Sequence, residues 1–303
     1  MMYDRVALIG LGLIAGSIAL AARRRGLAGH IVGTARTAET RATALRIGLV
    51  DEVVETAAKA VQGADLVILC VPVGAMAAVA AEIGPHLAPG CVVSDVGSVK
   101  QAVVDAVAPH LPAHAIFIPA HPVAWTEHSG PESGFATLFD NRFCLLTPTE
   151  GTPEEETARY RAFWEGMGAK VEEMDAEHHD RVLAVTSHVP HLIAYTMVGV
   201  ADDLRRVTNS EVIKFSAAGF RDFTRIAASD PTMWRDVFLN NESATLEILG
   251  RFTEELFALQ RAIRKGDGEH LFDHFTRTRA IRRGILEIGQ DTDAPDFGRK
   301  RPD

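Results

Sequence analysis

The chain has 303 residues, a formal net charge of −9 and a hydrophobic content of 47%. This length suits two domains or one large domain with an ample core. A net negative charge argues against a nucleic-acid surface, so any bound anion should be small and held locally. No charged segment precedes an apolar one at the N-terminus, and we identify no apolar run of transmembrane length. The composition therefore predicts a cytoplasmic protein that binds neither nucleic acid nor a membrane.

The first predicted strand, Arg5–Ile9, leads directly into a glycine-rich turn. The first glycine permits a tight turn, and the second lets backbone N–H groups approach a pyrophosphate at the start of the following helix. Ala15 takes the third position of the G-x-G-x-x-G/A pattern, in the strand–turn–helix context that dinucleotide binding requires. An ordinary βα turn is the alternative. The predicted cofactor contacts in this turn are Gly10, Leu11, Gly12, Leu13 and Ile14.

The second predicted strand, His30–Thr34, ends without an acidic residue. An Asp or Glu there would bind the ribose 2′-hydroxyl of NAD, whereas a guanidinium pairs with the 2′-phosphate of NADP. Arg36 and Thr37 stand beside the expected ribose. The sequence therefore favours NADP, with stacking of Arg36 on adenine or its solvation as the alternative.

Five further strand-like runs follow, with helical stretches between most of them. Such alternation is typical of βαβ units with a parallel sheet, so the fold class is an α/β Rossmann-type dinucleotide-binding domain over residues 1–175. The runs are Leu66–Val71, Cys91–Asp95, Ala115–Ile118, Phe143–Thr147 and Lys170–Met174.

Ligands gather at the carboxyl ends of parallel strands. Val71 and Pro72 end one strand, and Asp95 and Gly97 end the next, so we predict that these four residues contact the cofactor. Ser98 follows as a candidate catalytic residue, with a simple helix N-cap as the alternative.

His121 lies just beyond the predicted strand Ala115–Ile118 and precedes Pro122, which rigidifies the exit. A histidine has the right pKa for proton transfer near neutral pH. We therefore treat His121 as a candidate general base, with Glu127 on the same loop.

From Ala176 onward the periodicity is helical, which predicts an all-α substrate and dimerisation domain over residues 176–290 and a disordered tail over 291–303. The stretch Val185–Val200 is apolar nearly all round. It should be deeply buried or form a subunit interface, and we expect a homodimer made by this half.

Two groups of polar residues stand out in the helical half. His188 and His191 are three residues apart on one helical face, but no third ligand has suitable spacing, so we predict no metal. Arg221 and Arg225 are four apart and together suit a carboxylate, with Asp222 between them. Surface ion pairs, which contribute little, are the alternative.

Five motifs in this order resemble the prephenate/arogenate dehydrogenase family over about residues 5–290. The resemblance implies a dinucleotide-binding domain joined to a helical dimer-forming domain. It also implies oxidative decarboxylation of the small-molecule substrate prephenate or arogenate, with hydride transfer to NAD(P), in tyrosine biosynthesis. The motifs are VALIGLGLIAGS, SDVGSVK, AHPVAWTEHSGP, TSHVPHLIAY and GFRDFTRIAASDPTMWRD.

The resemblance also implies roles for single residues. His121 would hydrogen-bond the substrate 4-hydroxyl and assist its deprotonation, and Ser98 would lie near that hydroxyl and the nicotinamide. Arg225 would bind a substrate carboxylate, and His191, with His188 nearby, would position the substrate.

Three further residues are implied at the substrate site. Glu127 would be a gating or pocket acid, Asp222 would form an ion pair that frames the pocket, and Trp234 would reach the neighbouring subunit's site. One departure is Trp125, where the family usually has glycine. Tryptophan tolerates positive φ poorly, so the loop path or the pocket mouth should differ here.

Two other functions fit the same architecture. A β-hydroxyacid dehydrogenase would rely on a lysine in the helical half, but neither Lys214 nor Lys265 stands in the expected buried setting. A non-catalytic NADP-binding sensor would have no need of a proton acceptor such as His121.

Overall fold

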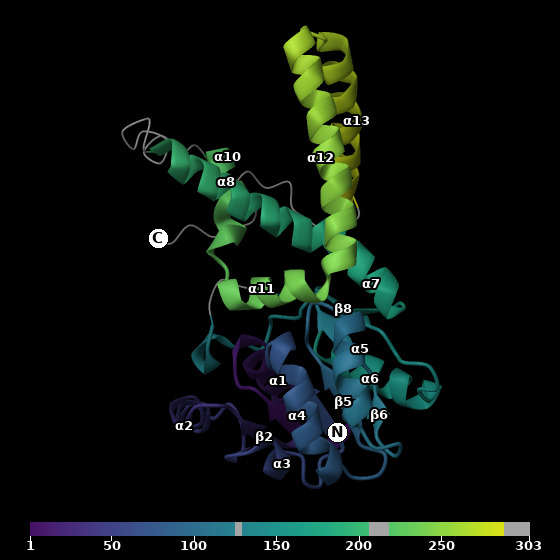
Figure 1. Ribbon diagram of the computed structural model, residues 1–303. Coiled ribbons are helices and arrows are strands. Elements are labelled where there is room, and N and C mark those ends of the chain that lie inside the picture. The colour runs from purple at the N-terminus through teal and green to yellow at the C-terminus, as the bar shows by residue number, and fades with distance from the viewer. Residues whose placement is uncertain (125–128, 206–217, 288–303) are drawn as a thin grey trace. The chain divides into compact units, whose positions relative to one another are not determined.

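The computed structural model describes residues 1–124, 129–205 and 218–287 (Figure 1). It divides into two compact units, Met1–Leu246 and Glu247–Asp303. The predicted domain boundary at residue 175 lies inside the first unit and stays a prediction. Trp125, Glu127 and the predicted tail 291–303 lie outside the described residues.

The first unit contains a six-stranded sheet with the order β3-β2-β1-β4-β5-β6, in which all neighbours are parallel. This order reverses between β1 and β4, where doubly wound sheets bind dinucleotides. The Rossmann-type prediction is thus confirmed. In this sheet only the two-residue β3 was missed, because it is too short to show alternation. The strands are β1 Tyr3–Ile9, β2 Ala28–Thr34, β3 Glu52–Val53, β4 Leu66–Leu69, β5 Val92–Asp95 and β6 Ile116–Phe117.

A second sheet of three strands, in the order β7-β8-β9, was not predicted as a separate sheet. Its strands are β7 Ala120–Pro122, β8 Phe143–Leu146 and β9 Lys170–Glu173. Strand β7 is antiparallel to β8 and carries His121 opposite Leu145. The prediction of a loop around His121 was therefore wrong. Pro122 fits here because β7 is an edge strand, where a missing N–H costs no ladder bond.

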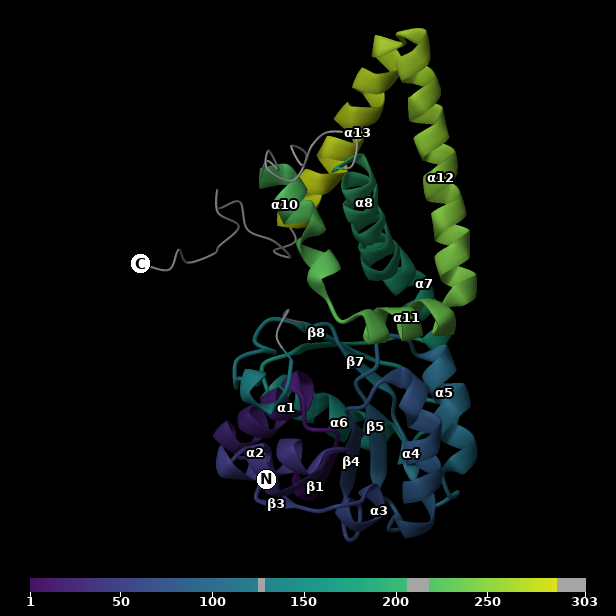
Figure 2. The same cartoon turned by 60° about the vertical axis from the view of Figure 1, so that its left-hand side comes forward.

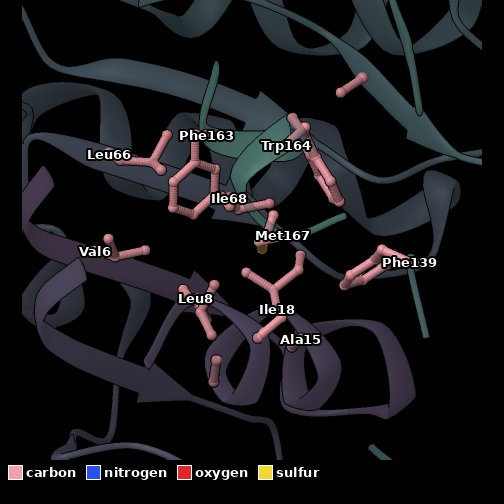
Figure 3. Close-up of a cluster of buried hydrophobic side chains, with 14 of the residues drawn as sticks. Val6, Leu8, Ala15, Ile18, Leu66, Ile68, Phe139, Phe163, Trp164 and Met167 are labelled. Carbon is pink, nitrogen blue, oxygen red and sulfur yellow. The ribbon is translucent and has the colours of Figure 1, made fainter. Parts of the chain in front are cut away.

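Helices cover both faces of the large sheet. Alternate side chains of one strand enter different cores: Val6 and Leu8 pack with α1 and α6, whereas Ala7 and Ile9 pack with α3, α4 and α5. Figure 2 shows α1 and α2 on one side of the sheet and α4 and α5 on the other. Figure 3 shows the first core, where Phe163 and Trp164 meet the strand residues. The α-helices are α1 Leu13–Arg24, α2 Ala38–Arg46, α3 Ala57–Ala60, α4 Met76–Ile83, α5 Gln101–Val107 and α6 Glu154–Gly166; the 3-10 turns are η1 Val73–Ala75, η2 Gly84–His86, η3 Ala108–His110 and η4 Pro131–Ser133.

Beyond Glu173 every described element is helical, as predicted. Helices α7 and α8 are continuous through the π-helical turn η5. Pro190 explains this turn, because it lacks the N–H that would bond to the carbonyl of Thr186 and the helix widens locally. The elements are α7 Ala176–Leu183, η5 Ala184–His188, α8 Val189–Arg205, α10 Ala218–Thr224, η6 Arg225–Ala228, α11 Pro231–Asn240, α12 Glu242–Lys265 and α13 Gly268–Glu287.

The helical segment Ala176–Asp203 is long and apolar enough to cross a membrane, by length and composition alone. The expectation that no run reaches this length was therefore too strict. Core helices of soluble proteins pass the same test when mostly buried, but only 28% of this apolar window is buried. The expectation of deep burial is wrong for Val185, Met197, Val198 and Val200, which are exposed in the single chain. The alternative, a subunit interface, stays a prediction.

Candidate active site

The turn after β1 has the form that a dinucleotide phosphate needs. Gly10 has a φ of +100°, and a Cβ there would lie 2.3 Å from the carbonyl oxygen of Cys70. Gly12 is the N-cap of α1, has no side-chain cap, and a Cβ there would meet nothing within 4 Å. The first N–H groups of α1 are therefore left for an anion, and these residues fit a cofactor pyrophosphate.

At the end of β2, Thr37 caps α2, because its Oγ1 accepts a hydrogen bond of 3.1 Å from the Thr40 N–H. Arg36 is exposed beside it. Arg41 adds a second guanidinium that the sequence analysis missed, and its Nη1 donates to the carbonyl of Ala35 at 2.6 Å. Two cationic side chains thus flank the position expected for the ribose.

The end of β5 holds a buried ion pair between Asp95 and Lys100, both of which are fully buried. The Asp95 carboxylate also accepts bonds from the N–H groups of Gly97 (2.7 Å) and Ala120 (3.2 Å). Lys100 Nζ donates to the Ala120 carbonyl at 2.7 Å. The ion pair therefore binds both the N–H and the carbonyl of Ala120, the residue before His121. All these contacts of the Asp95 carboxylate are internal, and its assignment as a cofactor contact stays a prediction.

Ser98 lies two residues before Lys100, the N-cap of α5, so the simple N-cap alternative is wrong. The first N–H groups of this segment bond elsewhere: the Asp180 carboxylate accepts from Lys100 N at 2.7 Å and from Gln101 N at 3.0 Å. Strand β4 ends two residues earlier than predicted, so Val71 and Pro72 follow it, and Gly97 follows β5. Their contacts with the cofactor stay predictions.

His121 is 7% exposed and lies at the centre of a polar cluster. Its Nδ1 is 2.9 Å from His179 Nε2, and His179 Nδ1 is 2.8 Å from Asp180 Oδ1. Burial lowers the pKa of His121 well below its usual value, and the nearby His179, Lys100 and His188 lower it further. His121 is therefore neutral near pH 7, the form that accepts a proton.

His188 is fully buried in η5. Asn241 Nδ2 donates to its Nδ1 at 3.0 Å and also to the Asp180 carbonyl at 2.9 Å. Burial lowers the pKa of His188 to about 4, although Asp180 and the Ser98 backbone act to raise it. Ser98, His121 and His188 are thus brought together in one cluster, and their roles stay predictions.

His191 and Trp234 form a second contact. Their rings are stacked with centroids 3.7 Å apart, and His191 Nδ1 donates to the Ser187 carbonyl at 2.8 Å. Burial lowers the pKa of His191, as does the neighbouring Arg225. Trp234 is buried against its own chain, and the expectation that it reaches a neighbouring subunit's site stays a prediction.

Asp222 and Arg225 lie close together in sequence, on α10 and at the start of η6, respectively. Glu127 lies outside the described residues. Four residues of the cluster were missed, namely Lys100, His179, Asp180 and Asn241. The adjacent acid and histidines in EHHDR (177–181) were the one local signal for them. Within the described parts of the chain, no group of three or more potential ligands could hold a metal ion.

Comparison with known proteins decides the family. The model of the prephenate dehydrogenase nucleotide-binding domain matches residues 18–173, and that of the prephenate dehydrogenase dimerization domain matches residues 175–277. The chain belongs to the prephenate dehydrogenase family. It is 40% identical to a cyclohexadienyl dehydrogenase of Zymomonas mobilis, over 93% of this chain and 96% of that protein. It is 34% identical to a prephenate dehydrogenase of Bacillus subtilis, over 94% and 76% of the two chains.

Solved structures agree. Prephenate dehydrogenase from Aquifex aeolicus, in complex with hydroxyphenyl propionate and NAD+, matches with a TM-score of 0.86 and 33% identity over 93% of this chain and 98% of that chain. Synechocystis arogenate dehydrogenase matches with a TM-score of 0.79 and 28% identity over 93% and 99%.

Family membership confirms the resemblance, the fold class and an NAD(P)-dependent oxidoreductase that acts on prephenate or arogenate in tyrosine biosynthesis. The β-hydroxyacid dehydrogenase and the non-catalytic sensor are not favoured. The roles of single residues remain predictions.

Proposed function

We propose that this chain oxidatively decarboxylates prephenate, arogenate or both, with His121 as the base. One observation carries the assignment of the base: His121 is buried and neutral, and its Nδ1 is engaged with His179, so that Nε2 is the ring atom left for a substrate. Ser98 lies in the same cluster, and Arg225, which lies near His191, supplies a cation for a substrate carboxylate.

The chemistry needs three contributions from the protein. His121 Nε2 takes the proton of the substrate 4-hydroxyl, and it returns this proton to the phenolate oxygen once the ring is aromatic. Arg225 holds an anionic end of the substrate, with His191 beside it, and so aligns the ring carbon that loses hydride. A dinucleotide held by its pyrophosphate at the β1 turn would supply the nicotinamide that accepts the hydride. Loss of the ring carboxylate as carbon dioxide provides the electrons that make the ring aromatic.

The cofactor is proposed to be NADP in preference to NAD. Arg36 is exposed at the end of β2, and a guanidinium pairs with a 2′-phosphate bidentately.

We also propose a cytoplasmic homodimer that forms through the helical half. Support comes from the match of residues 175–277 to a dimerization domain and from the exposed apolar side chains of α8. Sedimentation as a monomer at micromolar concentration would contradict this assembly.

The proposed reaction is tested by a paired assay. Purified enzyme is given prephenate or arogenate with NAD or NADP, while carbon dioxide release and reduced nicotinamide are both measured. We expect equal amounts of the two products with at least one substrate. Reduced nicotinamide without carbon dioxide would indicate a different oxidation, and no turnover with any of the four combinations would refute the proposal.

A further inference from the structure

Two residues that the sequence analysis did not single out, His179 and Asp180, lie directly behind His121. We propose that they are positioning residues, which hold the His121 proton on Nδ1 and so leave Nε2 as the base. The inference rests on the proposed function in one respect, namely that His121 is the base.

The direction of each hydrogen bond follows from the carboxylate at the end of the chain. An ionised carboxylate only accepts, so His179 Nδ1, 2.8 Å from Asp180 Oδ1, must carry the proton. In a neutral ring the other nitrogen is then an acceptor, so His179 Nε2 accepts from His121 Nδ1 at 2.9 Å. His121 Nε2 is consequently without a proton. One carboxylate thereby sets the tautomers of two imidazoles.

Asp180 is itself held in place. Its Oδ1 accepts from Lys100 N at 2.7 Å, and its Oδ2 accepts from Gln101 N at 3.0 Å. Its backbone carbonyl accepts from Asn241 Nδ2 at 2.9 Å. Four hydrogen bonds therefore fix the carboxylate and its backbone, and side-chain rotation would leave buried N–H groups unpaired.

Burial gives the arrangement its strength. His179 is fully buried, and Asp180 is 5% exposed. Burial lowers the pKa of His179, and the adjacent Asp180 opposes this shift. Water therefore does not compete for the hydrogen bonds among His121, His179 and Asp180, so the orientation of each side chain depends on the other two. The titratable or charged groups that face the two rings are Asp95, Lys100, Asp180 and His188.

The arrangement also favours the charged state that forms during the reaction. When His121 Nε2 takes the hydroxyl proton, its Nδ1–H bond to His179 becomes charge-assisted and stronger. His179 in turn is polarised by the Asp180 carboxylate. A carboxylate that orients a catalytic imidazole and stabilises its imidazolium performs the same task in hydrolytic triads.

The tautomer can be measured directly on the intact parent enzyme. The protein is labelled with ¹⁵N-histidine, and the ring nitrogens are observed by long-range ¹H–¹⁵N NMR at pH 7 to 8. His121 is assigned by the signals that disappear in His121→Asn. We expect His121 with its proton on Nδ1. A proton on Nε2 would overturn the proposal, and this result requires neither turnover nor a folded variant of His179.

Two substitutions of His179 separate positioning from packing. Phe keeps a ring where the two imidazole centroids are 5.1 Å apart but removes the acceptor, whereas Gln keeps an acceptor oxygen. We expect His179→Phe to lower kcat about a hundredfold, with KM and the cofactor Kd within about threefold. His179→Gln should stay within about tenfold of the parent kcat. His178→Phe, at the exposed neighbouring histidine, is the matched control and should keep the parent kcat.

Equal losses in the Phe and Gln variants would mean that His179 only packs, and would overturn the proposal. A fully active His121→Asn enzyme would instead refute the proposed base, while the tautomer measured in the parent would still decide whether His179 and Asp180 position the ring.

Discussion

The turn after β1 and the cluster around His121 are held by different kinds of interaction. The turn is local: one glycine is required by the backbone, and another leaves open space at the start of a helix. The cluster joins groups 58, 61 and 80 residues apart in sequence through buried hydrogen bonds. A buried polar group that loses its partner costs more than an exposed one. Substitutions in the cluster should therefore change both turnover and the free energy of unfolding. In the turn, one substitution should change stability and another should change cofactor binding.

The largest effect is expected for the proposed base. His121→Asn removes the proton acceptor, so kcat should fall by about 10²- to 10⁴-fold. The cofactor Kd should change little, because no predicted cofactor contact is removed. Steady-state kinetics and cofactor titration measure the two quantities. A variant that keeps most of its turnover would exclude His121 as the base.

The cluster also predicts how stability depends on pH. Burial lowers the pKa of His188 from 6.5 to about 4, so the folded state prefers the neutral ring. As pH falls below 6.5, the unfolded chain binds the proton first. The stabilisation is thus complete above pH 6.5 and is lost between pH 6.5 and 4. His188 alone should lower the free energy of unfolding by up to about 3 kcal/mol over this range.

Urea unfolding at pH 7 and pH 4.5 measures this loss. The lowered pKa values of His121 and His179 act in the same direction. His188→Gln should flatten the pH dependence, and an unchanged slope in this variant would assign the effect to other groups.

The glycine turn offers a matched pair. Gly10→Ala places a Cβ 2.3 Å from the Cys70 oxygen at a φ of +100°, so it should lower the free energy of unfolding by at least about 2 kcal/mol. In Gly12→Ala the new Cβ meets open space, so the free energy of unfolding should change by less than about 1 kcal/mol. It should nevertheless raise the cofactor Kd at least about tenfold, because its methyl group occupies the space that a pyrophosphate approaches. Equal cofactor affinity in Gly12→Ala and the parent would place the phosphates elsewhere.

The difference between the two regions also explains what the sequence could predict. The β1 turn was recognisable because a strand, two glycines and a helix are adjacent in the chain. The strand β7 was not, because three residues beside prolines show no periodicity and pair only with the distant β8. His179, Asp180 and Asn241 acquire their roles from contacts across 53 to 80 residues, which no local pattern encodes. Family resemblance identified His121 and His188 without supplying the hydrogen bonds that orient them.

Substrate anchoring is expected to affect binding more than chemistry. Arg225→Ala removes a cation close to His191, so KM should rise at least about tenfold while the parent fold is kept. Arg221→Ala, four residues earlier on α10, is the matched control and should leave KM within about twofold. If the two variants exchange these results, Arg221 holds the carboxylate and Arg225 is a surface residue.

The smallest expected effect concerns the cofactor. Arg36 is exposed at the end of β2, and its guanidinium can bind a 2′-phosphate bidentately, which the unphosphorylated ribose cannot match. The parent should prefer NADP over NAD by about tenfold in kcat/KM, or about 1.4 kcal/mol. Arg36→Ala should erase this preference by weakening the binding of NADP alone.

Arg41→Ala is the informative comparison. The Arg41 guanidinium already bonds to the Ala35 carbonyl at 2.6 Å, so its removal should weaken the binding of NAD and of NADP by a similar factor. Selective loss of NADP in the Arg41 variant would transfer the role to Arg41. Equal use of both cofactors by the parent would mean that neither arginine reads the phosphate, and that Arg36 contacts adenine or solvent.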